Sequence, residues 1–299
     1  MDFAAHLQGV WAALLTPLTD DRGIDLDALH KHAGGLVEAG VHGVVPLGTT
    51  GEFCEFAAGE RAEILRVTVE SVAGRVPVLA GVTGLSLVQT LRHIDDAREM
   101  GADAVLVLPP LYWKLDESGL YDYFAEIATV SSLPVVAYDY PALTAQKIPV
   151  SVLRRLAAEQ PNVVGVKLTV RDLFEITSVL AAVKAERPGF RVVTGFEDLL
   201  PAALHAGADG AISGMANFCP DLLLEIHREV RGSGQRLPAA LAELTKLFGV
   251  YQLSAPPILA LKAATEATGR PVRARVRAPG GEVAAVRDAV TGLLGGRAW

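Results

Sequence analysis

Short runs of apolar residues recur along the chain, and each run is followed by a longer stretch in which apolar residues repeat with helical spacing. The apolar runs, which we expect to be strands, are residues 10–15, 43–47, 76–82, 104–108, 134–138, 163–168, 191–195 and 210–213. The stretches with helical spacing are residues 25–39, 57–73, 87–100, 119–131, 151–158, 172–185 and 199–206. Continuously apolar strands that alternate with helices are typical of a parallel sheet covered on both faces.

The number of strand–helix units indicates how this sheet is closed. Eight units predict an α/β fold of the (β/α)8 TIM-barrel class. The alternative is an open doubly wound sheet, which is disfavoured because no Gly-x-Gly-x-x-Gly motif follows the first strand. Later helical stretches predict a C-terminal helical extension. We therefore expect residues 1–219 to form a catalytic barrel and residues 220–299 to form a helical region packed on it.

Polar residues that precede the helical stretches predict where some helices begin. Candidate N-caps are Asp25, Ser86, Ser118 and Ser151.

Composition and charge narrow the class of protein. Of 299 residues, 51% are hydrophobic and 20% are charged, so a sizeable core is expected and disorder is not. The net charge is −7 and basic residues gather only at 270–277, which argues against a nucleic-acid partner. No signal peptide and no membrane-spanning run is visible, and Cys54 and Cys219 suggest no disulfide framework. We expect a cytoplasmic protein with no membrane partner.

Lys167 interrupts the apolar run of residues 163–168, which otherwise has the composition of a buried strand. Burial disfavours an ammonium ion and lowers the lysine pKa, and a neutral amine can attack a carbonyl carbon. The alternative is that the side chain extends to solvent at the end of the strand. Tyr138 ends the preceding strand, so the two side chains can meet if both point into the barrel.

Two loops are expected at the same face of the barrel, where active sites of this fold lie. The segment 48–52, Gly-Thr-Thr-Gly-Glu, offers the hydroxyls of Thr49 and Thr50 and backbone N–H groups that suit an anion. The segment 109–114 contains Tyr112 and Trp113. Each feature has an ordinary structural explanation, as a turn, a core tyrosine or a barrel rim, but their coincidence at one face favours a site.

Together these residues suggest Schiff-base chemistry on a 2-oxo acid. The lysine would attack the keto carbon, and the iminium would accept electrons from a carbon–carbon bond. The tyrosine would transfer protons, while the threonines and amides would hold the carboxylate. The seven histidines are scattered singly, so we predict no metal site and no cofactor.

Several motifs together resemble the dihydrodipicolinate synthase / N-acetylneuraminate lyase family. They are the segments 48–52, 138–144, 165–167 and 210–217, and the similarity runs from Gly9 to the C-terminal helices. This resemblance implies a pyruvate-dependent class I aldolase, built as a homotetramer that is a dimer of tight dimers.

The resemblance also implies a role for individual residues. Lys167 would form the Schiff base and Tyr138 would be the general acid and base. Thr49 would connect Tyr138 to a second tyrosine, whose place Tyr112 occupies and which in relatives reaches across a subunit interface. Thr50 and the neighbouring amides would bind the carboxylate of pyruvate.

Departures from the family pattern favour the branch of neuraminate lyases and 2-keto-3-deoxy sugar acid aldolases. Leu143 stands where the synthase branch carries an arginine for its anionic aldehyde, and an apolar side chain cannot make that contact. Glu197 and Asp198 stand where lyases bind sugar hydroxyls, although both could instead cap a helix that begins at Leu199. The other substrate-binding candidates are Gly48, Gly51, Thr169, Gly195, Ile212 and Ser213.

These observations predict a lyase that reversibly cleaves a 2-keto-3-deoxy sugar acid to pyruvate and an aldehyde. The alternatives are a dihydrodipicolinate synthase, which condenses pyruvate with aspartate semialdehyde, and a keto-deoxy acid dehydratase. A non-catalytic barrel is least favoured, because such a protein need not keep the lysine, the tyrosine and both threonines. Asp139 and Gly214 differ from the residues usual in neuraminate lyases, so the sugar acid itself stays open.

Overall fold

Eight parallel strands form the centre of the molecule. The structure is a computed structural model that describes residues 2–278 and 281–295, so residues 1, 279–280 and 296–299 of the predicted domains lie outside it. The strands are β1 (Gly9–Ala13), β2 (Gly43–Val45), β3 (Leu79–Gly81), β4 (Ala104–Val107), β5 (Val135–Asp139), β6 (Val163–Leu168), β7 (Arg191–Thr194) and β8 (Gly210–Ser213). Their order is β2-β1-β8-β7-β6-β5-β4-β3, and a parallel bridge between Val44 and Val78 joins the two ends. The predicted (β/α)8 barrel is therefore confirmed.

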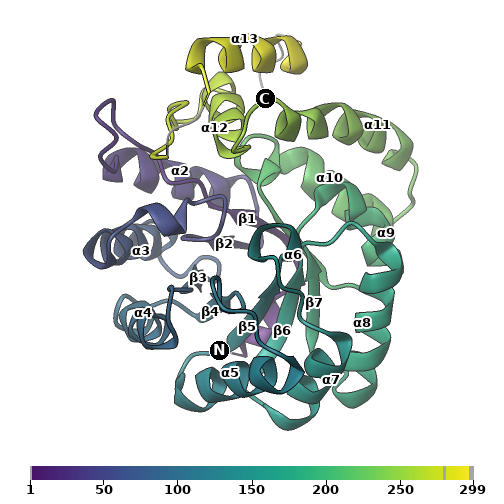
Figure 1. The fold of residues 1–299 in the computed structure, drawn as a ribbon. Coiled ribbons are helices and arrows are strands. Elements are labelled where there is room, and N and C mark those ends of the chain that lie inside the picture. The colour runs from purple at the N-terminus through teal and green to yellow at the C-terminus, as the bar shows by residue number, and fades with distance from the viewer. Residues whose placement is uncertain (1, 279–280, 296–299) are drawn as a thin grey trace.

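Helices surround this barrel, as Figure 1 shows. The helices that follow successive strands are α2 (Leu26–Glu38), α3 (Ala58–Val72), α4 (Leu87–Glu99), α5 (Glu117–Val130), α7 (Val150–Glu159), α8 (Leu173–Glu186), α9 (Leu200–His205) and α10 (Pro220–Arg231). Shorter helical pieces are α1 (Phe3–His6), α6 (Pro141–Thr144), η1 (Phe53–Glu55), η2 (Glu197–Leu199) and η3 (Met215–Asn217). The sequence pattern thus predicted the main helices to within a few residues at their ends.

Two of the four predicted helix caps are correct. The side chains of Asp25 and Ser86 accept backbone N–H groups at the starts of α2 and α4. The caps predicted at Ser118 and Ser151 are wrong. Asp116 caps α5 two residues earlier, because its carboxylate captures a free N–H of the first turn, and Ser151 already lies inside α7.

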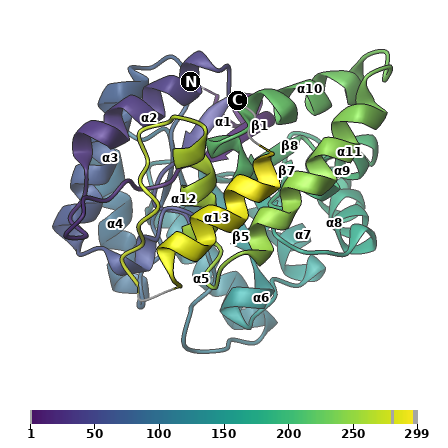
Figure 2. The ribbon, with the colours of Figure 1, turned by 90° about the horizontal axis from the view of Figure 1, so that it is seen from above.

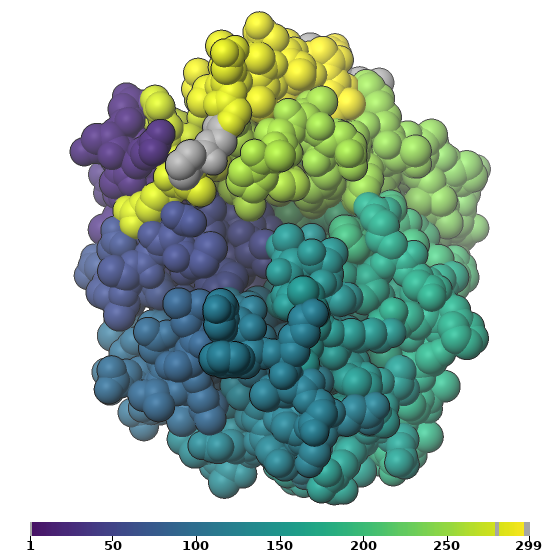
Figure 3. Space-filling model, in the orientation of Figure 1, coloured from purple at the N-terminus to yellow at the C-terminus, as the bar shows by residue number. Residues whose placement is uncertain are grey.

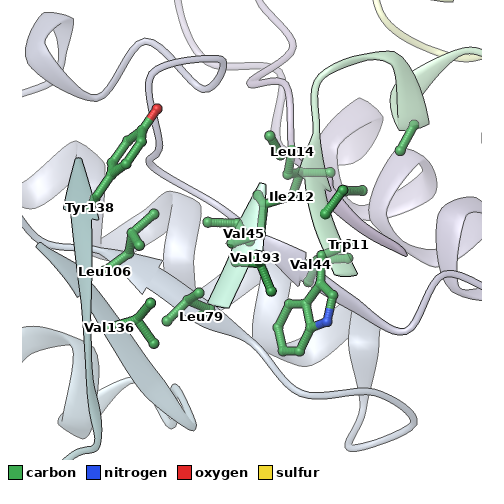
Figure 4. Close-up of a cluster of buried hydrophobic side chains, with 14 of the residues drawn as sticks. Trp11, Leu14, Val44, Val45, Leu79, Leu106, Val136, Tyr138, Val193 and Ile212 are labelled. Carbon is green, nitrogen blue, oxygen red and sulfur yellow. The ribbon is translucent and has the colours of Figure 1, made fainter. Parts of the chain in front are cut away.

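Apolar side chains fill the interior of the barrel. Figure 4 shows part of this layer, in which the buried side chains of the strands are Trp11, Val44, Leu79, Leu106, Val136, Val193 and Ile212. Tyr138 lies beyond Leu106 and Val136, with its hydroxyl on the side remote from them (Figure 4). The interior is therefore a packed core that becomes polar only towards the carboxyl ends of the strands.

The C-terminal helices α11 (Leu237–Leu247), η4 (Phe248–Gln252), α12 (Ile258–Ala267) and α13 (Val283–Leu294) gather at one end of the molecule (Figures 1 and 2). Figure 3 shows their side chains packed directly on the rest of the molecule. Helix α10 contacts β1 and α9, so it completes the eighth strand–helix unit. We therefore propose a boundary after Arg231, later than the predicted 219. Within the described residues, no helix is long and apolar enough to cross a membrane.

Candidate active site

Lys167 and Tyr138 occupy paired positions on the neighbouring strands β6 and β5. Paired residues of parallel strands point to the same face of the sheet. The Lys167 Nζ lies 4.2 Å from the centroid of the Tyr138 ring. Both side chains are buried, with exposed fractions of 5% and 3%. The structure thus brings together the two residues that the sequence singled out.

Burial sets the charge of Lys167. It lowers the pKa of the ammonium from 10.5 to about 7, although the carboxylate of Glu197 acts in the opposite direction. Near neutral pH a large share of Lys167 is then a neutral amine, the form that attacks a carbonyl carbon. Gly195 leaves space for this lysine, because a Cβ there would overlap Thr169 and lie 3.1 Å from Lys167 Cε.

Tyr138 is held as a neutral phenol next to two hydroxyls. Its oxygen lies 3.3 Å from Thr49 Oγ1, and either group can donate the hydrogen bond. Burial raises the pKa of Tyr138 to about 12, while the hydroxyls of Thr49 and Thr169 oppose the shift. A neutral phenol that both donates and accepts hydrogen bonds can pass a proton between substrate and threonine.

The loop that carries Thr49 and Thr50 is held by backbone geometry and by a buried ion pair. Glu52 has φ +56°, in the left-handed region that a residue with a Cβ rarely adopts. A Cβ on Gly51 would lie 2.9 Å from the carbonyl oxygen of Leu14, so glycine is required there. The carboxylate of Glu52 accepts from Lys262 Nζ at 2.6 Å, and both side chains are buried. Helix α12 therefore anchors this loop.

A cavity of about 340 Å³ opens above Lys167. The predicted site residues among those that line it are Thr49, Thr50, Tyr138, Leu143, Lys167, Thr169, Gly195 and Ile212. Sequence reasoning did not assign the other lining residues to the site, namely Ala13, Tyr140, Arg171, Phe196, Gly214, Phe248, Tyr251, Gln252, Pro256, Pro257, Ile258 and Leu261. The last seven come from the C-terminal region. This region lies far from Lys167 along the chain, and no sequence pattern indicates that it packs against the site.

Glu197 and Ser213 lie behind the wall of this cavity. Glu197 is fully buried, and its Oε1 accepts hydrogen bonds from Ser213 Oγ at 2.7 Å, Met215 N at 3.1 Å and Tyr251 Oη at 2.8 Å. The packed C-terminal region covers Glu197, so its carboxylate does not line the cavity of the single chain, and its contact with substrate hydroxyls stays a prediction.

Asp198 is also occupied by a protein partner. Its Oδ2 accepts a hydrogen bond from Arg171 Nη1 at 2.7 Å. The alternative role of Glu197 and Asp198 as helix caps is wrong, because η2 and α9 begin without a side-chain cap.

Three further candidates lie away from the cavity lining. Tyr112 is 78% exposed, packs edge to face against Trp113 and does not line the cavity, so its expected role across a subunit interface stays a prediction. Gly48 and Gly51 belong to the loop that presents the two threonines, and they shape it without lining the cavity. The geometry of a single chain therefore leaves Tyr112 without contact to the site.

Potential metal ligands are dispersed. Within residues 2–278 and 281–295, side chains of His, Cys, Asp and Glu form no group of three that could hold a metal ion. His42 and His227 pack with ring centroids 5.3 Å apart, and His42 Nδ1 accepts from the backbone of Val10 at the start of β1. This pair lies at the amino ends of the strands, opposite to the cavity.

The closed barrel and the buried amine at the carboxyl ends of its strands define a (β/α)8 enzyme equipped for nucleophilic chemistry by lysine. The chain belongs to the dihydrodipicolinate synthetase family, whose model matches residues 6–291. The resemblance inferred from the motifs is thereby confirmed. Members of this family and its aldolase relatives are lyases, so this protein is a lyase.

Similar proteins carry names from both branches of the family. YagE of Escherichia coli K12, provisionally named a 2-dehydro-3-deoxy-D-gluconate aldolase, is 34% identical over 280 residues, which cover 93% of each chain. A 4-hydroxy-tetrahydrodipicolinate synthase of Methanospirillum hungatei is 36% identical over 260 residues, or 86% of this chain and 88% of that one. The crystal structure of YagE with pyruvate superimposes with a TM-score of 0.91, 32% identity and coverage of 96% and 99%.

Proposed function

We propose that this protein is a class I aldolase that cleaves a 2-keto-3-deoxy sugar acid to pyruvate and an aldehyde, or runs the reverse condensation. The observation that carries the proposal is the buried Lys167, its pKa lowered to about 7, paired across the strands with Tyr138. The pyruvate bound in the YagE structure supports a 2-oxo acid substrate.

The proposed reaction begins when the Lys167 amine attacks the 2-oxo carbon and water leaves, which forms an iminium. Tyr138 and Thr49 carry away the proton of the C4 hydroxyl as the C3–C4 bond breaks. The electron pair of that bond enters the iminium, giving an enamine and releasing the aldehyde. Protonation at C3 and addition of water then release pyruvate and restore the amine.

Other residues would bind and position the substrate. Thr50 lines the cavity beside Thr49, so we assign its hydroxyl and the amides of the glycine-flanked loop to the carboxylate of pyruvate. Ile212 and Thr169 would contact the three carbons of pyruvate.

We also propose that the protein is a homotetramer of tight dimers, in which Tyr112 would act across a subunit interface. Exposed large apolar side chains that lie together are typical of protein interfaces. Tyr112 and Trp113 are 78% and 71% exposed and in contact with each other. We therefore retain the proposal that Tyr112 completes the proton pathway of a partner subunit. Two free cysteines, Cys54 and Cys219, support the further proposal of a cytoplasmic setting.

A dihydrodipicolinate synthase is the second candidate, because a relative with that name is as similar as the aldolase relative. Leu143 argues against binding of aspartate semialdehyde in the way that the synthase branch binds it. The side chain lines the cavity, is 63% exposed and offers no donor for the carboxylate of aspartate semialdehyde. A keto-deoxy acid dehydratase would use the same lysine and differs only in the bond that breaks.

Borohydride trapping with pyruvate, followed by intact mass and peptide mapping, tests the proposed function. We expect a pyruvate-sized adduct on Lys167 and none on the Lys167→Ala variant. A folded protein without an adduct on any lysine would contradict the Schiff base and favour a non-catalytic barrel. Product analysis with a 2-keto-3-deoxy acid then separates the aldolase from the dehydratase, since only the aldolase releases pyruvate.

A further inference from the structure

Arg171 presents a guanidinium group to the cavity. It lies four residues after Lys167, in the loop between β6 and α8, and it lines the same cavity. Leu143, in the short helix α6 that follows β5, lines the cavity too. The loop after β6 thus brings a cation to the cavity, whereas Leu143 brings an apolar side chain from α6.

The guanidinium is held by neighbours that leave much of it available. Its Cζ lies 4.4 Å from the centroid of the Phe196 ring and 4.8 Å from that of Phe248. Nη1 donates to Asp198 Oδ2 at 2.7 Å. An arginine has five N–H donors in a fixed planar fork, and this is its one side-chain hydrogen bond to the described residues. A guanidinium fixed between two rings can bind a further group with little loss of entropy.

The charges around the cavity favour an anion as that further group. Lys167 and Arg171 are the only charged side chains among the described residues that line it. Asp198 pairs with Arg171 without lining the cavity, and Oε1 of the buried Glu197 is engaged by three donors. The described lining therefore contains two cationic side chains and no carboxylate, and the free N–H groups of Arg171 can bind an anion.

We propose that Arg171 determines specificity by binding a second anionic group at the end of the substrate remote from the 2-oxo carbon. This inference rests on the proposed function and deepens it. The loop at 48–52 would hold the first carboxylate and Arg171 the distal one, so the substrate would be a dianion, such as a 2-keto-3-deoxy acid that ends in a carboxylate. A distal phosphate shares the same chemistry, because both anions accept paired N–H groups from a guanidinium.

Condensation with matched aldehydes tests the proposal. Pyruvate would be combined with glyceraldehyde, with tartronate semialdehyde, in which a carboxylate replaces the terminal hydroxymethyl group, and with glyceraldehyde 3-phosphate. In each case C3 of the enamine bonds to the aldehyde carbon, and the terminal group is unchanged. We expect kcat/KM for at least one anionic aldehyde to exceed that for glyceraldehyde by about tenfold to a hundredfold, the effect of one charge-assisted contact. Whichever anion is preferred identifies the distal group.

The variants Arg171→Met and Arg154→Met separate a specific contact from a general loss of charge. Arg154 is a matched control, since it pairs with Glu186 at 2.8 Å and is 58% exposed, against 2.7 Å and 54% for Arg171. We expect Arg171→Met to remove the preference for the anionic aldehyde and Arg154→Met to retain it. Borohydride trapping of pyruvate should be unchanged in both variants.

A binding experiment keeps the proposal testable even if no condensation is seen. Calorimetric titration would compare 2-oxoadipate with 2-oxohexanoate, which have six carbons each and differ in the distal carboxylate. Tighter binding of 2-oxoadipate by at least about tenfold, lost in Arg171→Met, would support the proposal. Equal binding of the two acids, or equal use of neutral and anionic aldehydes, would overturn it. Failure of pyruvate trapping alone would instead refute the Schiff base.

Discussion

The amine of Lys167 lies over the ring of Tyr138, 4.2 Å from its centroid, because the two residues are register partners on adjacent strands. The register of the sheet therefore fixes the distance between the amine and the phenol, independently of any loop. A cation over an aromatic face is favourable, so the ring also suits the charged iminium that the proposed reaction forms.

The buried Lys167 should lower the stability of the fold below neutral pH. Its pKa is about 7 in the folded protein and 10.5 as an ordinary lysine, so between these values the unfolded chain binds a proton that the folded protein does not. Stability therefore rises with pH across this window. We expect Lys167→Met to be more stable than the wild type near pH 6, with the difference shrinking towards pH 10.

Urea unfolding at several pH values measures this effect. Lys31→Met is the control, because Lys31 is exposed on α2 and its removal should change stability little at any pH. A Lys167→Met variant that is less stable than the wild type near pH 6 would show that the amine is not destabilising in the folded state.

The variant Tyr138→Phe removes the proposed proton carrier and keeps the ring. We expect kcat to fall by about a hundredfold to ten-thousandfold, with a much smaller change in the affinity for pyruvate, because proton transfer acts in the transition state. Tyr123→Phe is a matched control, since Tyr123 is also buried, with a pKa raised to about 12, but lies on α5. An unchanged kcat in Tyr138→Phe would remove this residue from the mechanism.

The variant Glu197→Gln tests how a carboxylate behind the cavity tunes the amine. The charge of Glu197 raises the pKa of Lys167, so its loss should lower that pKa further. The amine then stays neutral at lower pH, and the rate of imine formation should decline at a lower pH than in the wild type. Stopped-flow measurements of imine formation with pyruvate, made at a series of pH values, record this decline in rate. A shift to higher pH, or the same shift in the exposed control Glu159→Gln, would contradict the assignment.

The buried pair of Glu52 and Lys262 should be essential to stability. Removing one partner leaves a buried charge unpaired, so we expect Lys262→Met to cost about 3–5 kcal/mol of unfolding free energy. Adding Glu52→Gln to this variant should restore part of the loss. Arg66→Met, which breaks an exposed pair on α3, should have a far smaller effect in the same denaturant experiment. Equal losses from the two single variants would be inconsistent with this account.

The variant Leu143→Arg tests the division between the two branches of the family. An arginine there would stand in the same cavity as Arg171 and Lys167, so we expect no gain in cleavage of a sugar acid whose distal end is uncharged. The measurement is kcat/KM for a 2-keto-3-deoxy sugar acid, with Leu143→Met as the control of similar volume. Improved cleavage in Leu143→Arg would contradict the placement of Leu143 beside the substrate.

Local patterns in the sequence were sufficient to predict the barrel and the chemical centre. Apolar runs mark strands that are buried on both faces, and a lysine in such a run stands out because its burial is costly. Lys167, Tyr138, Thr49 and Thr50 could therefore be found, since each lies at the end of a predicted strand and a barrel brings these ends together.

The outer wall of the cavity could not be predicted in the same way. Tyr251 and Ile258 lie in helical segments whose pattern indicates helix but not the surface against which they pack. The burial of Glu197 could not be predicted for the same reason, because Tyr251 donates a hydrogen bond to it from a segment 54 residues further along the chain. Long-range packing, and not local propensity, decides which carboxylate a substrate can reach.

The cavity draws its two halves from different stretches of the chain. Strands of the barrel supply the amine and the phenol, whereas residues from Phe248 to Leu261 supply much of the opposite wall. Mutations in that later stretch should therefore alter the opposite wall of the cavity, while Lys167 and Tyr138 stay fixed on strands of the barrel. During divergence of the family, such a layout would let new substrates be acquired while one inherited reaction is kept, and it makes this stretch the natural choice for exchange between relatives in the laboratory.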